Sequence, residues 1–138
     1  MSRGFACGSF DLLHAGHVVM LEECASHCDT LIVGLHADPS TERSDKNKPI
    51  QSLVERYIQL KAVKFVDEII PYQYEKELIE ILTTMNIDIR FIGSDWRGKD
   101  FTGRELVGSK HKIIYNKRQH GFSSSGLRGR IQSAALDL

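Results

Sequence analysis

The sequence has no excess of either charge, because eighteen lysines and arginines are balanced by eighteen aspartates and glutamates. A chain without net charge produces no overall field that would attract nucleic acid or an anionic membrane. No apolar run approaches the roughly 20 residues that a membrane helix needs. The N-terminus leads into a strand-like segment instead of a signal peptide. We therefore expect a cytoplasmic protein whose partners are small molecules, with no nucleic acid and no membrane among them.

Cysteine is scarce as well, with three residues at Cys7, Cys24 and Cys28. Three thiols cannot all pair with one another, so small buried side chains in a reducing compartment are the simpler interpretation. The alternative is a zinc site formed by Cys24, Cys28 and His27, but the paired Cys-x-x-Cys clusters of structural zinc are missing. The cysteines therefore predict no metal-binding framework.

The hydrophobic pattern alternates between short apolar runs and helical spacing. Strands are expected near residues 4–9, 29–36, 66–71, 87–92 and 112–115, and helices near 15–27, 53–64, 74–85 and 126–134. Strands separated by helices of this length favour right-handed βαβ units. We predict one α/β domain over residues 1–138, Rossmann-like, with a mostly parallel sheet and helices on both faces.

Two common phosphate-binding motifs, the Gly-x-x-x-x-Gly-Lys-Ser/Thr loop and the Gly-x-Gly-x-x-Gly fingerprint, are absent. A different candidate, Gly8–His17, lies where the first expected strand gives way to a helix. Helix-start amides favour anions, and His14 and His17, about one turn apart, can donate hydrogen bonds to phosphate oxygens. Gly16 leaves room between them. A turn with two capping or surface histidines, or a paired-histidine metal site, remains open from the residues alone.

The whole Gly8–His17 stretch resembles the signature of the cytidylyltransferases, a Gly-x-Phe-Asp turn followed by His-x-Gly-His. The resemblance covers nearly the full chain and is greatest to the bacterial glycerol-3-phosphate cytidylyltransferases. It continues through Glu55-Arg56, the segment 66–71, Gly93-Ser94-Asp95-Trp96 and Ser123-Ser124-Ser125. Adenylyltransferases share the His-x-x-His motif but usually lack this Gly-x-Asp-Trp context.

This resemblance implies an enzyme that transfers CMP from CTP to a phosphorylated alcohol, with glycerol 3-phosphate as the expected acceptor. The products would be CDP-glycerol, used for a cell-surface polymer or lipid, and pyrophosphate. It also implies Mg²⁺ or another divalent cation and a homodimer. Phosphoethanolamine, phosphocholine, a sugar phosphate or an amino-acid-derived phosphate are alternative acceptors. An adenylyltransferase and a non-catalytic nucleotide sensor are the alternative functions.

The resemblance also assigns roles to individual residues. The expected catalytic residues are His14, His17, Lys46 and Arg118. The expected nucleotide-binding residues are Gly8, Ser9, Phe10, Asp11, Gly16, Asp95, Ser123 and Ser124. The expected substrate-binding residues are Lys48, Arg56, Lys64 and Trp96, with Asp11 as a weak candidate for metal binding. Solvated lysines, surface salt bridges, a turn with an aspartate cap and a plain helix cap are the structural alternatives.

Some positions depart from the family pattern. Lys64 stands where relatives often carry arginine. The lysine keeps the positive charge but lacks the bidentate fork of a guanidinium group. Ser124 and Ser125 replace threonines, so the hydroxyl groups persist. The segment Asp100-Phe101-Thr102-Gly103 also differs and is expected to line the acceptor pocket. These departures leave the acceptor as the least determined part of the interpretation.

Overall fold

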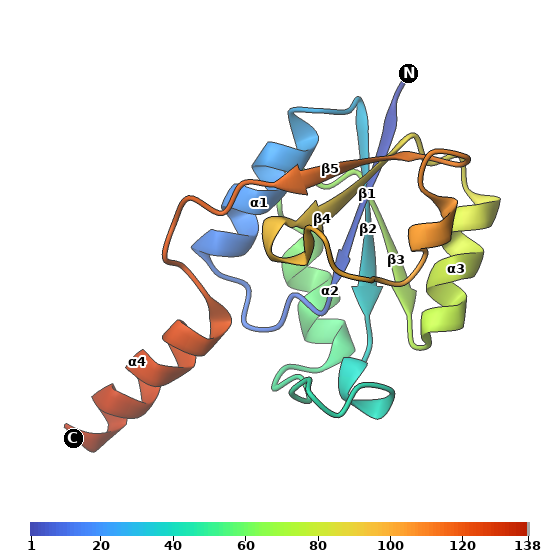
Figure 1. Cartoon of the computed structure of the whole chain (residues 1–138). Coiled ribbons are helices and arrows are strands. Elements are labelled where there is room, and N and C mark those ends of the chain that lie inside the picture. Colours follow the sequence, from blue (N-terminus) through green and yellow to red (C-terminus); the bar gives the residue numbers. More distant parts are fainter. Residues whose placement is uncertain (138) are drawn as a thin grey trace.

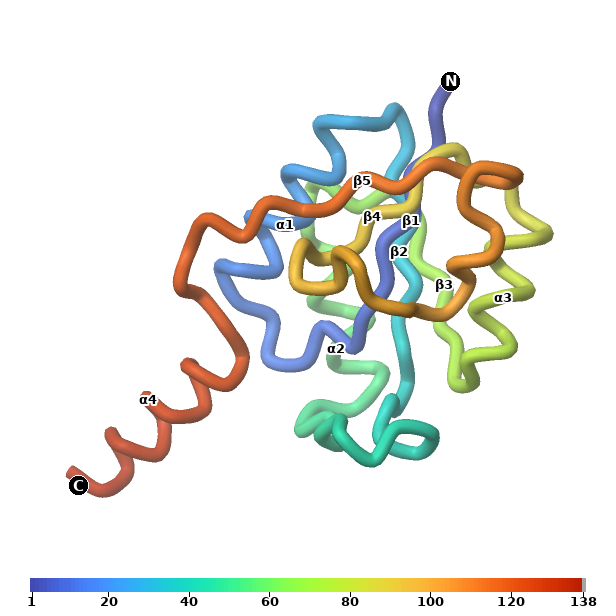
Figure 2. Tube along the Cα trace, viewed as in Figure 1, coloured from blue at the N-terminus to red at the C-terminus, as the bar shows by residue number. Residues whose placement is uncertain are grey.

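Figures 1 and 2 show a computed structural model that describes residues 1–137 of the chain. Its centre is a five-stranded sheet in the order β3-β2-β1-β4-β5, and every recorded strand pair is parallel. The strands are β1 (Arg3–Gly8), β2 (Thr30–His36), β3 (Glu68–Tyr72), β4 (Ile89–Gly93) and β5 (Lys112–Asn116). The predicted fold class is confirmed, and Leu138, the last residue of the predicted domain, lies outside the described residues.

Helices cover both faces of the sheet because successive strand residues point to opposite sides. On one face, β-strand residues such as Ala6 and Val33 pack with Leu21 of α1 (Ala15–Ala25) and Leu60 of α2 (Leu53–Lys61). On the other face, Phe5 and Ile32 pack with Leu78, Ile81 and Leu82 of α3 (Glu75–Thr84). The two apolar clusters thus leave the sheet buried on both sides, as its continuous apolar strands predict.

The carboxyl ends of all five strands lie at the same edge of the parallel sheet. The segments that leave this edge include three short 3₁₀ helices: η1 (Pro39–Thr41), η2 (Ser94–Trp96) and η3 (Arg104–Leu106). Strand order reverses between β1 and β4, where a parallel sheet leaves a crevice beyond its strand ends. The site is expected at that crevice.

The last helix, α4 (Ser124–Leu136), projects away from the body of the molecule in Figures 1 and 2. Its N-cap is Ser123, whose hydroxyl oxygen accepts a 3.0 Å hydrogen bond from the amide of Gly126. The helix expected from the sequence is present. No described residue of α4 is buried, so this helix does not pack over the core. Among residues 1–137, no helix has the length and apolar character needed to span a bilayer.

Candidate active site

The turn between β1 and α1 is strained. Phe10 and Leu12 have φ angles of 49° and 52°, a left-handed conformation that bulky side chains rarely adopt. The strain is tolerated because Phe10 is buried in the core and the amide of Leu12 donates to Gln51 Oε1 at 2.8 Å. Strained backbone of this kind persists where the surrounding structure holds it and is frequent at functional sites. Here it sets the entry of α1 toward the sheet edge.

The two histidines of this turn form a capping box at the start of α1. His14 Nδ1 accepts from the amide of Gly16 at 3.0 Å, and His17 Nδ1 accepts from the amide of His14 at 3.2 Å. An Nδ1 atom that accepts a hydrogen bond carries no proton, so each neutral ring has its proton on Nε2. The capping alternative is therefore realised, and it also orients two Nε2 donors.

Both rings are neutral near pH 7. Burial lowers the pKa of His17 to about 4, with a further lowering by His14 that Asp11 opposes. Burial also lowers the pKa of His14, as do the charges of His120 and Arg118. The ring centroids lie 4.0 Å apart with the ring planes tilted by 30°, a proximity that two imidazolium ions would disfavour. The pair thus acts as fixed hydrogen-bond donors rather than as cations.

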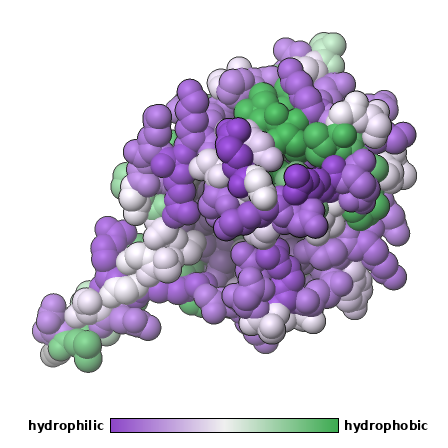
Figure 3. All heavy atoms as spheres, viewed as in Figure 1, coloured by the Kyte–Doolittle hydropathy of each residue, from purple (hydrophilic) through white to green (hydrophobic). Residues whose placement is uncertain are grey.

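A cavity of about 850 Å³ opens at this edge of the sheet. Its size lies at the upper end of ligand-binding pockets, with room for more than one small molecule. In Figure 3 a hollow with mainly hydrophilic walls lies beside the base of α4. The structure brings together eleven of the predicted site residues around it: Gly8, Ser9, His14, Gly16, His17, Lys46, Asp95, Trp96, Arg118, Ser123 and Ser124.

The N-terminus of α4 contributes one wall of the cavity. Ser124 Oγ lies 3.1 Å from His14 Nε2, and this contact joins the two helix starts. Gly16 permits this approach, since a Cβ atom there would lie 3.0 Å from the carbonyl oxygen of Phe122 and 2.8 Å from His14 Cε1. Two helix N-termini therefore face one space, and both favour a bound anion.

Basic side chains and an aromatic ring form the opposite wall. Lys46 Nζ lies 5.9 Å from the centroid of the Trp96 ring, and the guanidinium carbon of Arg43 lies 5.4 Å from it. Arg43 was not predicted, although its position in the same polar loop as Lys46 could have suggested it. A cation beside an aromatic face gains electrostatic energy, which fits two basic residues held over the cavity.

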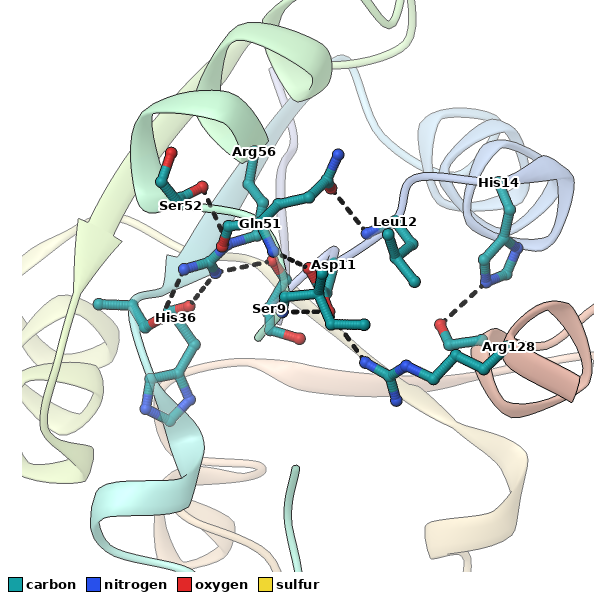
Figure 4. Close-up of polar contacts among 12 residues, drawn as sticks. Ser9, Asp11, Leu12, His14, His36, Gln51, Ser52, Arg56 and Arg128 are labelled. Carbon is teal, nitrogen blue, oxygen red and sulfur yellow. Dashed lines mark hydrogen bonds and ion pairs between the residues drawn. The ribbon is translucent and has the colours of Figure 1, made fainter. Parts of the chain in front are cut away.

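Asp11 does not line this cavity but a smaller pocket of about 160 Å³ that shares Ser9, Lys46 and Ser124 with it. The carboxylate is 5% exposed and accepts from the amides of Ile50 and Gln51, both at 2.9 Å. It also pairs with Arg128 Nη2 at 2.9 Å (Figure 4). Because both oxygen atoms are occupied by protein donors, Asp11 ties the β1–α1 turn to the start of α2 and to α4.

The structure does not support the assignment of Arg56 to substrate binding, because its side chain does not line the cavity. Its side chain is 2% exposed and donates to five backbone carbonyl oxygens (Figure 4). These belong to Gln51 at 3.1 Å, Ser52 at 3.3 Å, Ser9 at 3.0 Å, His36 at 2.7 Å and Ala37 at 2.6 Å. The guanidinium thus joins the loops after β1 and β2, and it acts in positioning them.

Three further predicted residues lie away from the cavity. Lys64 is exposed between α2 and β3, over the ring of Phe65 with Nζ 5.2 Å from the centroid. Lys64 precedes β3 in the chain, so it lies near the amino ends of the strands, at the edge of the sheet opposite the site. Lys48 is exposed in the loop after β2, near enough to lower the pKa of Asp38. Phe10 is 4% exposed and belongs to the core.

Cys24 is buried as expected, whereas Cys7 and Cys28 are only partly buried. The sulfur of Cys24 contacts Met20 Sδ at 3.6 Å and Asn116 Nδ2 at 3.3 Å. Burial raises the pKa of Cys24 to about 12, so the thiol stays protonated. Within residues 1–137 no cluster of three or more His, Cys, Asp or Glu side chains could hold a metal ion.

Sequence reasoning also missed Arg90, a buried cavity residue on β4. The signal was present, since Arg90 is the one charged residue of the apolar strand sequence IRFIG. A charge in a strand covered on both faces is rarely buried without a partner. A single charged residue in an apolar strand therefore indicates a candidate site residue.

The fold and the site together define an α/β protein with a cavity at the carboxyl edge of its parallel sheet, beside two helix N-termini. Comparison with known families narrows this class: residues 5–130 match the family described as cytidylyltransferase-like. The chain belongs to that family. The family resemblance read from the Gly8–His17 motif is confirmed.

Individual relatives fall into two groups. The glycerol-3-phosphate cytidylyltransferase of Bacillus subtilis is 30% identical over 131 residues, which cover 95% of this chain and 98% of that protein. The bifunctional protein HldE of Campylobacter concisus is 33% identical over 134 residues, which cover 96% of this chain. The chain spans only 28% of the length of that HldE protein.

A solved structure supports the same architecture. The lipopolysaccharide core biosynthesis protein of Thermoplasma volcanium superimposes with a TM-score of 0.72 at 28% sequence identity. The match covers 87% of this chain and 99% of that one. The glycerol-3-phosphate cytidylyltransferase and the HldE protein are similar to this chain at nearly the same identity, so sequence identity alone does not select one acceptor.

Proposed function

We propose that this chain transfers CMP from CTP to a phosphorylated alcohol, with glycerol 3-phosphate as the first acceptor to test. The observation that carries the proposal is the pair of neutral imidazoles, His14 and His17, which line the cavity beside two helix N-termini and carry their protons on Nε2. The similarity to the Bacillus subtilis glycerol-3-phosphate cytidylyltransferase along nearly its full length supports the choice of nucleotide and acceptor.

In the proposed reaction, an oxygen of the acceptor phosphate attacks the α-phosphorus of CTP and forms a new phosphorus–oxygen bond. The bond from the α-phosphorus to the bridging oxygen breaks, and pyrophosphate leaves with the electron pair. An ionised phosphate needs no catalytic base, so the protein supplies positioning and charge stabilisation. His14 and His17 donate to phosphate oxygens as charge grows there, and Lys46 and Arg118 add positive charge.

The cavity residues fit a divalent cation carried by the substrate phosphates. Mg²⁺ usually binds through one or two carboxylates together with phosphates and water. Asp95 lines the cavity, and no ion pair within residues 1–137 involves its carboxylate. Asp95 would hold the cation, which would supply charge neutralisation on the triphosphate when bound. Asp11 is not proposed for this role because its oxygens are occupied.

The direct test is pyrophosphate release with CTP, Mg²⁺ and a panel of phosphorylated alcohols. Release with CTP and glycerol 3-phosphate, and none with ATP, is the expected result. Release with ATP instead would replace the cytidylyltransferase proposal with an adenylyltransferase. CTP binding without release for any acceptor in the panel would favour the nucleotide-sensor alternative.

We also propose that the chain forms a homodimer, on the basis of the family resemblance alone. Light scattering of the purified chain at several concentrations tests it. A mass near twice 15.6 kDa supports a dimer, and a mass near 15.6 kDa at every concentration contradicts it.

A further inference from the structure

The cavity continues beyond the histidine pair onto the α3 face of the sheet. This second compartment, here called the α3 chamber, is lined by Cys7, Tyr72, Glu75, Arg90, Phe101 and Thr102. Cys7 and Arg90 belong to β1 and β4 and alternate with Ala6 and Phe91, which pack on the opposite face. The chamber therefore lies on the other side of the sheet from α1, whose first turn carries the histidines.

Arg90 is the only charged strand residue in the α3 chamber, and it is 4% exposed. Its Nη1 donates to the carbonyl oxygen of Thr102, and its guanidinium carbon lies 5.1 Å from the centroid of the Phe101 ring. Its Nε is buried and has no hydrogen-bond partner. None of the ion pairs recorded within residues 1–137 includes Arg90.

Cys7 and Tyr72, the two strand neighbours of Arg90 in the chamber, provide no counter-charge. Burial raises the pKa of the Cys7 thiol, although the charge of Arg90 opposes this effect. Burial likewise raises the pKa of Tyr72, and the nearby Cys7 adds to it. Both groups are therefore protonated and uncharged near pH 7. The carboxylate of Glu75 also lines the chamber, but no ion pair between it and Arg90 is recorded within residues 1–137, so the guanidinium keeps a buried Nε donor without a partner.

A buried guanidinium without an anion is costly, because burial removes hydration that no partner replaces. Arginine binds carboxylates and phosphates through two parallel hydrogen bonds, and the edge formed by Nε and Nη2 offers such a pair of donors. A ligand oxyanion in the chamber would satisfy the unpaired Nε and neutralise the charge.

We propose that the α3 chamber binds the acceptor and that Arg90 holds one of its oxyanions, either its phosphate or a carboxylate. This inference rests on the proposed transfer reaction. It also supplies the substrate-binding arginine that Arg56 cannot be, since all of Arg56's recorded bonds go to backbone carbonyls. The loop Asp100–Thr102, where the sequence departs from the family pattern, closes the chamber over Arg90.

Acceptor binding can be measured without turnover by titrating ligands in EDTA and following the fluorescence of Trp96, the single tryptophan. Two ligands with the same three-carbon skeleton are compared: glycerol 3-phosphate, and 3-phosphoglycerate, which adds a carboxylate. Arg90→Met should weaken acceptor binding about 10- to 100-fold, as expected when hydrogen bonds to a charged group are lost. CTP affinity should stay unchanged. Arg90→Lys should recover part of the loss because it keeps the charge without the fork.

The pattern across the two ligands identifies the oxyanion. An equal loss for both ligands assigns Arg90 to the phosphate, and a loss confined to 3-phosphoglycerate assigns it to a carboxylate. Unchanged affinity for both ligands in Arg90→Met, or no binding of either ligand to the wild-type chain, would overturn the proposal. Arg130→Met, at an exposed arginine of α4, controls for loss of positive charge alone.

Pyrophosphate release separates this inference from the proposed function. If wild-type chain releases pyrophosphate with CTP while Arg90→Met keeps the same acceptor KM, the reaction stands and the role of Arg90 fails. If acceptor binding depends on Arg90 but no pyrophosphate is released, the anion site stands and the reaction fails. Circular dichroism of Arg90→Met and Arg90→Lys distinguishes lost affinity from lost folding.

Discussion

Two buried arginines of this protein have opposite surroundings. Arg56 is 2% exposed and gives five hydrogen bonds to carbonyl oxygens of the loops after β1 and β2. Arg90 is 4% exposed, bonds to one carbonyl oxygen and keeps a buried Nε without a partner. Nearly equal burial thus accompanies hydrogen bonds from all three guanidinium nitrogens in Arg56 and an unpartnered Nε in Arg90.

The difference separates structural from ligand-binding roles. A guanidinium whose three nitrogens all donate to backbone carbonyls stabilises the chain segments that it joins. A guanidinium that keeps a free donor inside a cavity is costly to the empty protein and is stabilised by an anionic ligand. Burial alone would have ranked the two residues together.

The largest expected effect tests the structural role of Arg56. Arg56→Met should lower the free energy of unfolding by about 3–5 kcal/mol, because several buried carbonyl oxygens lose their only side-chain donor. Urea unfolding followed by circular dichroism measures it, with Arg56→Lys expected to lose less. A stable Arg56→Met chain with a raised acceptor KM would reverse the comparison and return Arg56 to the substrate site.

Next in size is the effect of removing a donor from the cavity. His14→Ala should reduce turnover at least ~100-fold, the scale for loss of one transition-state donor, with folding largely retained. The measurement is the initial rate of pyrophosphate release at saturating CTP and acceptor. His27→Ala, an exposed histidine outside the cavity, is the matched control. Near-normal turnover in His14→Ala would remove the histidine from the mechanism.

A smaller effect distinguishes the two possible roles of Asp11. Asp11→Asn removes the charge that pairs with Arg128 and at least one acceptor for the amides of Ile50 and Gln51. We expect a loss of about 1–3 kcal/mol in the free energy of unfolding. The Mg²⁺ concentration needed for half-maximal rate should not change. Unaltered stability with a large increase in that concentration would instead make Asp11 a metal ligand.

The smallest expected effect concerns pH. The pKa of His17 is about 4 in the folded chain, below its usual value near 6.5. Between these values the unfolded chain binds a proton that the folded chain does not, so stability is complete above pH 6.5 and falls as pH drops toward 4. His17→Gln should show a shallower fall of the unfolding free energy between pH 7 and 4.5. Equal slopes in His17→Gln and wild type would contradict the low pKa.

Sequence patterns predicted most of the fold because hydrophobic periodicity is local. Each predicted helix and strand is present with its ends shifted by a few residues; the helix expected over 53–64, for instance, ends at Lys61. Continuous apolar runs indicated strands buried on both faces, and the two core clusters confirm this. Helix ends were less certain because capping and the following turn decide them.

The residues that line the cavity were located more often from a motif than from charge alone. The Gly8–His17 motif located His14 and His17, and the Ser123-Ser124 pair located the start of α4. Basic residues outside a motif were harder to place, because a side chain's partners come from segments distant in sequence. Arg56 bonds to a carbonyl 47 positions away, and Lys64 lies toward the opposite edge of the sheet.

By itself, the sequence determined the α/β class, the phosphate-binding turn and the cytidylyltransferase-like family, since each depends on residues adjacent in the chain or at helical spacing. Only the tertiary structure decided which buried charges are satisfied. Asp11 and Arg56 find donors and acceptors on other segments, whereas Arg90 finds a cavity. The physical reason is that hydrogen-bond satisfaction depends on three-dimensional neighbours, and those neighbours exist only after the strands and loops have assembled.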